Sequence, residues 1–214
     1  MTASSAPVHV VWFKRDLRVH DHAPLAEAAA RGRVLPLYVA EPGFWALAES
    51  SGRQWRFVAE SLAELDADLR ARGSALVVRT GEAVDVVRDL LDRLPVAALW
   101  SHQETNNAWT FARDRRVAEL LRARGVPWHE RRQHGVIRGL ARRDGWAARW
   151  EQLMRAPPAA APEALNPPPL AVAAMPSAAA LGLADDPPLR QPGGRAAGHG
   201  LLASFFGPRG RDYR

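Results

Sequence analysis

The chain has no cysteine and only one lysine among its 214 residues. The lack of cysteine excludes disulfides, thiolate catalysis, cysteine-ligated zinc and iron–sulfur clusters. No run of about 20 apolar residues is present that could span a bilayer. The N-terminus "MTASSAPVHVVWF" also lacks the basic region and long apolar segment of a secretory signal. These absences predict a soluble, cytoplasmic protein.

Several catalytic motifs are missing as well. The first predicted strand is followed by neither G-x-G-x-x-G nor G-x-x-x-x-G-K-[ST], which argues against a dinucleotide-binding loop and a P-loop NTPase. Neither G-x-S-x-G nor H-E-x-x-H occurs, which argues against the common hydrolase elbow and the zinc peptidase helix. The histidines are scattered apart from His20 and His22, so we expect no metal site.

Arginine, in contrast, is abundant. Lysine and arginine together number 29 against 23 acidic residues, which gives a formal net charge of +6. A positive charge of this size raises the question of a nucleic-acid surface. However, most arginines alternate with acids, as in "LDADLRARG" and "DVVRDLLDR", which is typical of solvated helix faces. We therefore favour a compositional bias toward arginine over a genuine basic patch.

Short apolar segments alternate with segments of helical period over the first two thirds of the chain. Five apolar segments are predicted as strands: "VHVVWF", "VLPLYVAEP", "ALVVRTGE", "VAALWSHQE" and the weaker "WHERRQHGVI". Between them, apolar residues recur at helical spacing, most clearly from Trp55 to Leu69, where Gly73 ends the pattern. This alternation predicts an α/β domain over residues 8–150, with a five-stranded, parallel, doubly wound sheet of the Rossmann-like or flavodoxin-like kind.

The remainder of the chain changes character. Residues 151–192 are rich in proline and alanine and predict a partly extended connector, because proline removes amide donors and clashes with the preceding helical turn. Residues 193–214 predict one amphipathic helix.

Charged and polar residues follow the predicted strands, where a doubly wound sheet binds ligands. Lys14 and Arg15, directly after the first strand, are candidates for binding a charged ligand. For Asp16, Arg18 and Asp21 we favour a structural ion network that ties the turn to the following helix.

The segment "SHQETNNAWTF" after the fourth strand offers a second set of candidates. His102 either contacts a ligand or forms a hydrogen bond at the edge of the core. Glu104 has the two acceptor oxygens that a planar heterocycle requires, while Asn106 and Asn107 are suited to capping the next helix. Capping by all three residues is the alternative.

These segments together resemble a known family. "VVWFKRDLRVHDHAPL" is similar to the opening strand and turn of the DNA photolyase/cryptochrome family, with its pattern W-F-R-R-D-L-R-x-x-D-N-x-A-L. Matches follow in order at "VLPLYVAEP", "SGRQWRFVAESLAELDADLRARGSALVVRTGE" and "ALWSHQETNNAWTFARDRRV". The terminal "PGGRAAGHGLLASFFGPRGRDYR" resembles the first helix of that family's flavin-binding domain.

The resemblance implies two domains with different roles. In this family an N-terminal α/β domain can hold an antenna chromophore of the flavin, deazaflavin or folate type, and a helical C-terminal domain holds FAD and damaged DNA. Excited reduced flavin then splits a cyclobutane pyrimidine dimer flipped out of the duplex. Here the match stops after Tyr213, where the family has a tyrosine that contacts the FAD phosphates. The resemblance therefore implies an antenna domain, truncated or separately encoded, without repair activity of its own, and FAD and DNA only in a full-length parent.

The residues that we expect to bind the antenna chromophore lie at the strand ends and at the start of the long helix. They are Phe13, Lys14, Arg15, Val39, Glu41, Arg53, Gln54, His102, Gln103, Glu104 and Asn107.

Three departures from the family keep the chromophore type open. His22 stands where the family often has asparagine. The loop after the fourth strand is about two residues longer than in folate-binding members, so their pterin-holding glutamate corresponds to Thr105 or Asn107, with Glu104 close by. Gln54 falls where deazaflavin-binding members have arginine.

Two other hypotheses remain. The exposed apolar residues expected on the last helix, Leu201, Leu202, Phe205 and Phe206, favour a non-catalytic partner that docks on a separately encoded flavin-binding helical domain. A remnant without independent activity is the third. The sequence does not distinguish DNA repair from blue-light signalling.

Overall fold

A computed structural model describes residues 6–184, 189–211 and 213. Its sheet contains β1 (Val8–Phe13), β2 (Arg33–Ala40), β3 (Val77–Thr80), β4 (Val96–His102) and β5 (Trp128–Arg131) in the order β3-β2-β1-β4-β5. All four pairings are parallel. The prediction of a five-stranded, parallel, doubly wound sheet is confirmed. Its order, which reverses beside the central strand β1, is the Rossmann-like one.

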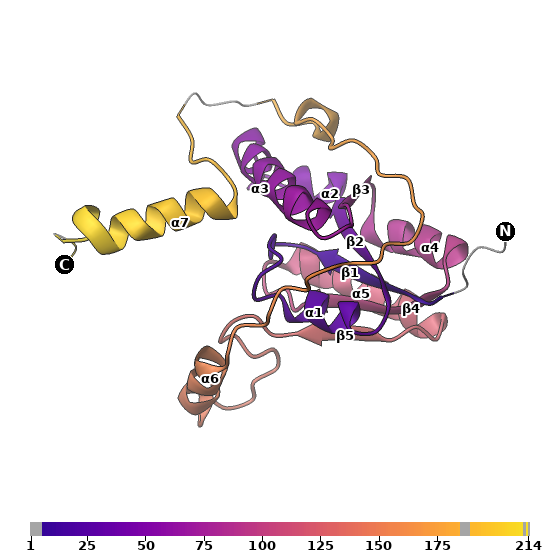
Figure 1. Ribbon diagram of the computed structural model, residues 1–214, viewed down its shortest axis with the longest axis horizontal. Helices are drawn as coiled ribbons and strands as arrows, with labels where there is room; N and C mark the ends of the chain where they lie inside the picture. Colours follow the sequence, from indigo (N-terminus) through magenta and orange to yellow (C-terminus); the bar gives the residue numbers. More distant parts are fainter. Residues whose placement is uncertain (1–5, 185–188, 212, 214) are drawn as a thin grey trace.

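Helices cover both faces of this sheet (Figure 1). On one face, α1 (Ala23–Ala29) and α3 (Gly52–Arg70) bury leucines against β1, and on the other α4 (Ala83–Arg93) and α5 (Ala108–Ala123) do the same. The side chains of β1 alternate between these two cores, so Val11 and Phe13 join the first and Val10 and Trp12 the second. Because both faces are covered, all six residues of β1 are buried.

The helices begin at side-chain caps that fix the chain just after each strand. His22 caps α1, Ser51 caps α3 and Asn107 caps α5, each accepting a backbone amide hydrogen bond. These caps determine where the loops at the carboxyl ends of β1, β2 and β4 turn back toward the sheet.

Two helices were not predicted. The short α2 (Pro42–Trp45) follows β2, and α6 (Trp146–Arg155) follows the loop after β5. Helix α6 extends beyond residue 150, so the predicted connector begins within it. Its apolar residues recur at four-residue spacing, at Trp146, Trp150 and Met154, and all three are partly exposed.

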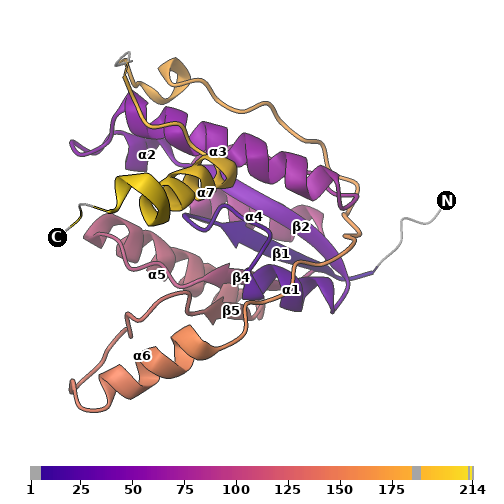
Figure 2. The ribbon, with the colours of Figure 1, turned by 60° about the vertical axis from the view of Figure 1, so that its left-hand side comes forward.

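The segment after α6 is mostly without regular secondary structure, and it packs on the domain (Figure 2). It runs across the face formed by α1 and α3, where Leu165 and Leu181 are buried in the first core. The Leu165 amide donates to the Arg72 carbonyl at 2.7 Å, and the Val34 amide donates to the Asn166 carbonyl at 2.9 Å. A single turn of 3-10 helix, η1 (Ala179–Leu181), interrupts it. Residues 185–188 of the predicted connector lie outside the described residues.

A terminal helix is present, but it is shorter than the predicted one over residues 193–214. Helix α7 spans Arg195–Ser204 and continues only into a wide turn, η2 (Phe205–Arg209). Gly207 has a non-helical ψ of −127°, and Pro208 lacks an amide hydrogen, so the helix does not continue. Residues 212 and 214 of the predicted helix are not among the described ones.

Helices α6 and α7 project from the same side of the molecule, opposite the N-terminus (Figure 1). Within the described part of the chain, every helix is too short or too polar to cross a lipid bilayer.

Candidate functional site

A cavity of about 810 Å³ opens at the carboxyl edge of the sheet. It lies at the ends of β1 and β2 and the start of the loop after β4, where the strand order reverses. Helices α2, α3 and α5 and the segment before α7 complete its walls. Ligands of doubly wound sheets bind at this position, because the loops on the two sides of the reversal diverge.

Six aromatic residues line the cavity. They come from β1, β2, α2 and α3 and are Trp12, Phe13, Tyr38, Phe44, Trp45 and Phe57. Trp12 and Phe13 are almost fully buried in the two cores, and the more accessible rings are those of Phe44 and Phe57. Phe44 packs edge-on against Trp45, with ring centroids 5.3 Å apart, and Trp45 packs in the same way against the buried Trp55 at 5.1 Å. These contacts hold the rings in place, so the wall is preformed for a planar ligand.

Arg113 of α5 is the charged centre of the cavity. Its side chain is 6% exposed and contacts three carboxylates. Nη1 donates to Glu41 at 2.8 Å, Nη2 to Glu104, and Nε to Asp114 at 3.0 Å. Burial alone would lower the pKa of Arg113, but the negative charges of Glu104, Glu41 and Asp114 raise it. The guanidinium therefore stays charged and fixes all three carboxylates.

Glu41 links this cluster to the next helix. Its second oxygen accepts a hydrogen bond from the Ala83 amide, the first residue of α4, at 3.0 Å. Burial raises the pKa of Glu41, and Arg113 only partly offsets this effect. Glu41 is thus held at the end of β2 by contacts to two other elements.

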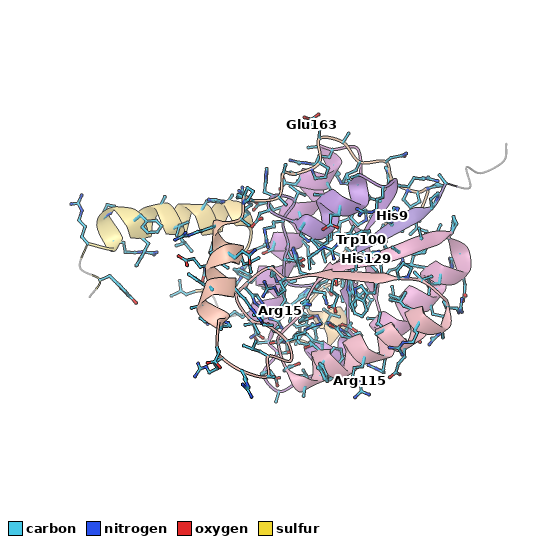
Figure 3. The ribbon with its side chains drawn as sticks, turned by 90° about the horizontal axis from the view of Figure 1, so that it is seen from below. His9, Arg15, Trp100, Arg115, His129 and Glu163 are labelled. Carbon is cyan, nitrogen blue, oxygen red and sulfur yellow. The ribbon has the colours of Figure 1, made fainter. Side chains whose placement is uncertain are left out.

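The predicted cations Lys14 and Arg15 differ in their access to the cavity. The Lys14 ammonium is 5% exposed, pairs with Asp114 at 3.3 Å and lies 4.9 Å from the centroid of the Trp12 ring. Arg15 pairs with Glu104 at 3.1 Å but is half exposed. Figure 3 shows Arg15 toward the side from which α6 and α7 project. Of the two, Arg15 is therefore the one open to a charged ligand.

A second buried cluster joins the turn after β1 to α1 and β4. Asp16 Oδ2 contacts His22 Nε2 at 2.8 Å and His102 Nδ1 at 2.6 Å, and Asp16 Oδ1 accepts from the Lys14 amide at 2.9 Å. The Leu25 amide donates to His22 Nδ1, so Nε2 carries the proton that His22 donates to Asp16. The predicted ion network of Asp16, Arg18 and Asp21 is found in part: Asp16 ties the turn to α1 through His22, and Arg18 pairs with Asp21 at 3.9 Å.

Burial acts on the two titratable groups of this cluster in different ways. Burial alone would raise the pKa of Asp16, but the two imidazoles hold it well below its usual value. The pKa of His22 is lowered, because burial outweighs the attraction of Asp16. The ligand atoms of Asp16, His22 and His102 lie within 4.8 Å of one another, a grouping that resembles a metal site. Direct hydrogen bonds, 2.6 to 2.8 Å long, occupy the space between them.

The structure brings most of the predicted site residues together. Nine line the cavity: Phe13, Lys14, Arg15, Val39, Glu41, Arg53, Gln54, Glu104 and Asn107. Asn107 also caps α5, accepting from the Thr110 amide at 3.0 Å, which fulfils the alternative role considered for it.

Three predicted site residues lie elsewhere. His102 and Gln103 line a smaller, adjoining pocket of about 220 Å³, and the His102 ring is held by Asp16. Tyr213 is 78% exposed and does not line the cavity.

Sequence reasoning missed Arg113 and most of the aromatic wall. Arg113 does carry a signal, since Thr110, Arg113, Val117 and Leu121 recur at helical spacing and all are buried. A charged residue on the buried face of a helix indicates a partner of opposite charge. Phe44 and Trp45 belong to the four-residue α2, which is too short to show a period.

Comparison with known proteins gives consistent results. The family model for DNA photolyase matches residues 9–140. A cryptochrome DASH from Gloeobacter violaceus is 39% identical over 116 residues, which are 51% of this chain and 23% of that protein. A deoxyribodipyrimidine photo-lyase from Streptomyces griseus is 35% identical over 124 residues, 57% of this chain and 27% of that protein. The chain thus spans about a quarter of the length of these relatives.

Solved structures extend the likeness to nearly the whole chain. The Synechocystis cryptochrome aligns with 96% of this chain and 47% of its own, with a TM-score of 0.76 and 22% identity, which shows the shared fold. An archaeal photolyase from Sulfolobus tokodaii aligns with 91% of this chain and 46% of its own, with a TM-score of 0.63 and 25% identity. That protein was solved with two FAD molecules, with the implication of a novel light-harvesting cofactor in it.

Proposed function

Since this chain belongs to the DNA photolyase family, we propose that its α/β domain binds an antenna chromophore, a planar light-absorbing pigment, in the cavity at the carboxyl edge of the sheet. The single observation that carries this proposal is the aromatic wall of that cavity. Six aromatic residues face one space of about 810 Å³. This volume lies within the roughly 300–1,000 Å³ typical of small-molecule and cofactor sites, which also combine apolar walls with a few polar groups.

The polar groups of the cavity suit a pigment with ring nitrogens and an anionic tail. Each oxygen of Glu104 accepts a hydrogen bond from one arginine and retains a further lone pair. Glu104 can therefore still accept a hydrogen bond from a ring N–H. Arg15 and Arg53 line the same cavity and are suited to a phosphate or carboxylate. In this proposal the Arg113 cluster fixes Glu104, and the aromatic rings hold the plane of the pigment.

Flavin, deazaflavin and folate pigments all share these features. The second FAD in the Sulfolobus tokodaii structure favours a flavin here. In a full-length parent, the bound pigment would pass its excitation to a flavin in a helical domain that acts on DNA or signals.

Titration of the full chain with FMN, and separately with 5-formyltetrahydrofolate, tests the proposal, with quenching of flavin or tryptophan fluorescence as the readout. We expect Phe44→Ala to weaken binding about tenfold, since a lost aromatic contact costs on the order of 1.4 kcal/mol. Phe111→Ala is the matched control, because Phe111 lies on α5, is 61% exposed and does not line the cavity. Failure of both compounds to bind, or equal loss in both variants, would contradict the proposal.

The exposed face of α7 favours a second candidate function, docking on a helical flavin-binding domain. Leu202 is 50% exposed and Phe206 79% exposed, and nearby Phe205 packs on Phe206 with ring centroids 5.8 Å apart. Exposure of an apolar face of this kind to water is energetically unfavourable. Mixing the chain with the helical domain of the Streptomyces griseus photo-lyase tests the idea by light scattering. A complex that Leu202→Asp abolishes is expected, and a monomeric chain in every mixture would refute it.

A further inference from the structure

The segment before α7 is bound to α3 by a regular set of hydrogen bonds. We call residues 190–196, "RQPGGRA", the strap. The Gly193 amide donates to Glu60 Oε2 at 2.7 Å, the Gly194 amide to Ser61 Oγ at 2.9 Å, and the Ala196 amide to Glu64 Oε1 at 2.9 Å. All three acceptors are side chains of α3. These side chains therefore satisfy amides at the start of α7 that would otherwise have no partner in the helix.

An ion pair adds to this contact. Both terminal nitrogens of Arg190 donate to the Glu60 carboxylate, one of them at 2.9 Å. Glu60 thus holds the strap at two points, a side chain and a backbone amide. Two parallel hydrogen bonds also fix the orientation of the guanidinium, so the strap has one defined position on α3.

The two glycines of the strap are required by this close approach. A side chain on Gly193 would overlap the backbone carbonyl of Phe57 and crowd Ser61. Gly194 has a φ of +102°, and a side chain there would overlap the Glu64 carboxylate. Nothing comparable surrounds Gly198 within α7, where an added Cβ would meet open space. The glycine pair therefore allows the strap to lie directly against α3.

The strap is also part of the cavity wall. Gln191, Gly194 and Arg195 line the cavity together with Phe57 and Ser61 of α3. Figure 2 shows α7 beginning beside α3. Arg195 is exposed, and within the described part of the chain its side chain has no ion pair. Its guanidinium is therefore available at the rim of the cavity to a group of opposite charge.

We propose that the strap closes the chromophore cavity, with Arg195 contacting an anionic group of the bound pigment. Pigment binding and the docking of α7 on α3 then stabilise each other. This inference rests on the proposed function, and it adds that the direction of α7 depends on whether the cavity is filled. Such coupling is reciprocal. If bound pigment strengthens the attachment of the strap by a given factor, release of the strap weakens pigment binding by the same factor.

Hydrogen exchange of the full chain, with and without FMN, tests the coupling. We expect FMN to slow exchange of the amides at positions 193, 194 and 196 at least fivefold. Gly194→Ala should speed exchange of the same segment without ligand and weaken FMN binding about fivefold. Gly198→Ala, the matched glycine in α7, should change neither quantity. If the wild-type chain binds FMN while exchange in the strap is unchanged, the strap inference is overturned and the proposed function stands.

The role of Arg195 is tested with two flavins that differ in their tail. Lumiflavin has the ring system of FMN without its ribityl phosphate. We expect Arg195→Gln to weaken FMN binding about fivefold and to leave lumiflavin binding unchanged, with Arg142→Gln, an exposed arginine away from the cavity, as control. Equal FMN affinity in the wild-type chain and Arg195→Gln would overturn the assignment of Arg195. Binding of neither flavin to the wild-type chain would overturn the proposed function as well.

Discussion

Two clusters of buried charge lie near the end of β1, and they differ in what surrounds them. In the cluster around Asp16, hydrogen bonds from His22, His102 and the Lys14 amide reach both carboxylate oxygens. In the cluster around Arg113, the partners are carboxylates that themselves border a large cavity. Both oxygens of Asp16 are occupied by protein partners, although a small pocket of about 220 Å³ adjoins them, whereas the second cluster presents polar atoms to the large cavity.

This difference separates structural from functional charge more clearly than residue type does. Histidine and aspartate are typical catalytic and metal-binding residues, yet here they fasten a turn to α1 and β4. Arginine and glutamate form the charged centre of the cavity, although most residues of these two types in the sequence are typical of solvated helix faces. What a buried charge faces, and not its chemical class, indicates its role.

The largest expected effect comes from breaking the Arg113 cluster. Arg113→Met should lower the free energy of unfolding by about 3–5 kcal/mol, because it leaves Glu41, Glu104 and Asp114 buried without their common counter-charge. Urea denaturation followed by circular dichroism measures the loss. The control is Glu41→Gln, which keeps the shape and the hydrogen bond to Ala83 and should cost less than about 1.5 kcal/mol. A loss below about 1 kcal/mol for Arg113→Met would mean that water already screens the cluster.

A smaller effect is expected from acid acting on the Asp16 cluster. Because the pKa of His22 is lowered in the folded chain, the unfolded chain takes up this proton at a higher pH than the folded chain does. The free energy of unfolding should therefore fall as pH decreases below about 6.5. The lowered pKa of Asp16 adds a second loss below its ordinary value, near pH 4. Unfolding free energies measured between pH 7.5 and 3.5 should show both steps. His22→Asn, which retains a helix-capping group, should reduce the first step, to which His9 also contributes because burial lowers its pKa. An unchanged pH profile in this variant would contradict the assignment to His22.

The smallest effect should be confined to the strap. Hydrogen bonds from Arg190 and the Gly193 amide lower the pKa of Glu60 to about 2. The stabilisation of the strap by Glu60 is therefore complete above the ordinary pKa of a glutamate, and it is lost as pH falls from there toward 2. Hydrogen exchange of the strap, corrected for intrinsic rates, should accelerate between pH 5 and 2.5 before global unfolding. Glu60→Gln should exchange faster at pH 5 and show no such pH dependence, whereas an identical acceleration in this variant would assign it to another group.

The fold followed from the sequence because its signals are local. Apolar strands, helical periods and breakers such as Gly73 recur in order, and the charged breaks after "VVWF" and "ALWS" mark the ligand edge of the sheet. Lys14, Arg15 and Glu104 follow those strands closely and Glu41 directly follows β2, which explains why these cavity residues were found. What could not be predicted depends on contacts distant in the sequence. His102 is held by Asp16, 86 residues earlier, and the strap contacts Glu60 from 133 residues later.

The burial of Lys14 has a practical consequence for handling the protein. This chain has a single lysine, and its amine lies between Asp114 and two tryptophan rings. Reagents or enzymes that acylate, methylate or cross-link surface lysine side chains will therefore find almost no target here. The cationic exterior consists of guanidinium groups, which remain charged far into alkaline solution. Attachment to a support or a dye is better directed to an introduced cysteine, since the native sequence contains none to compete.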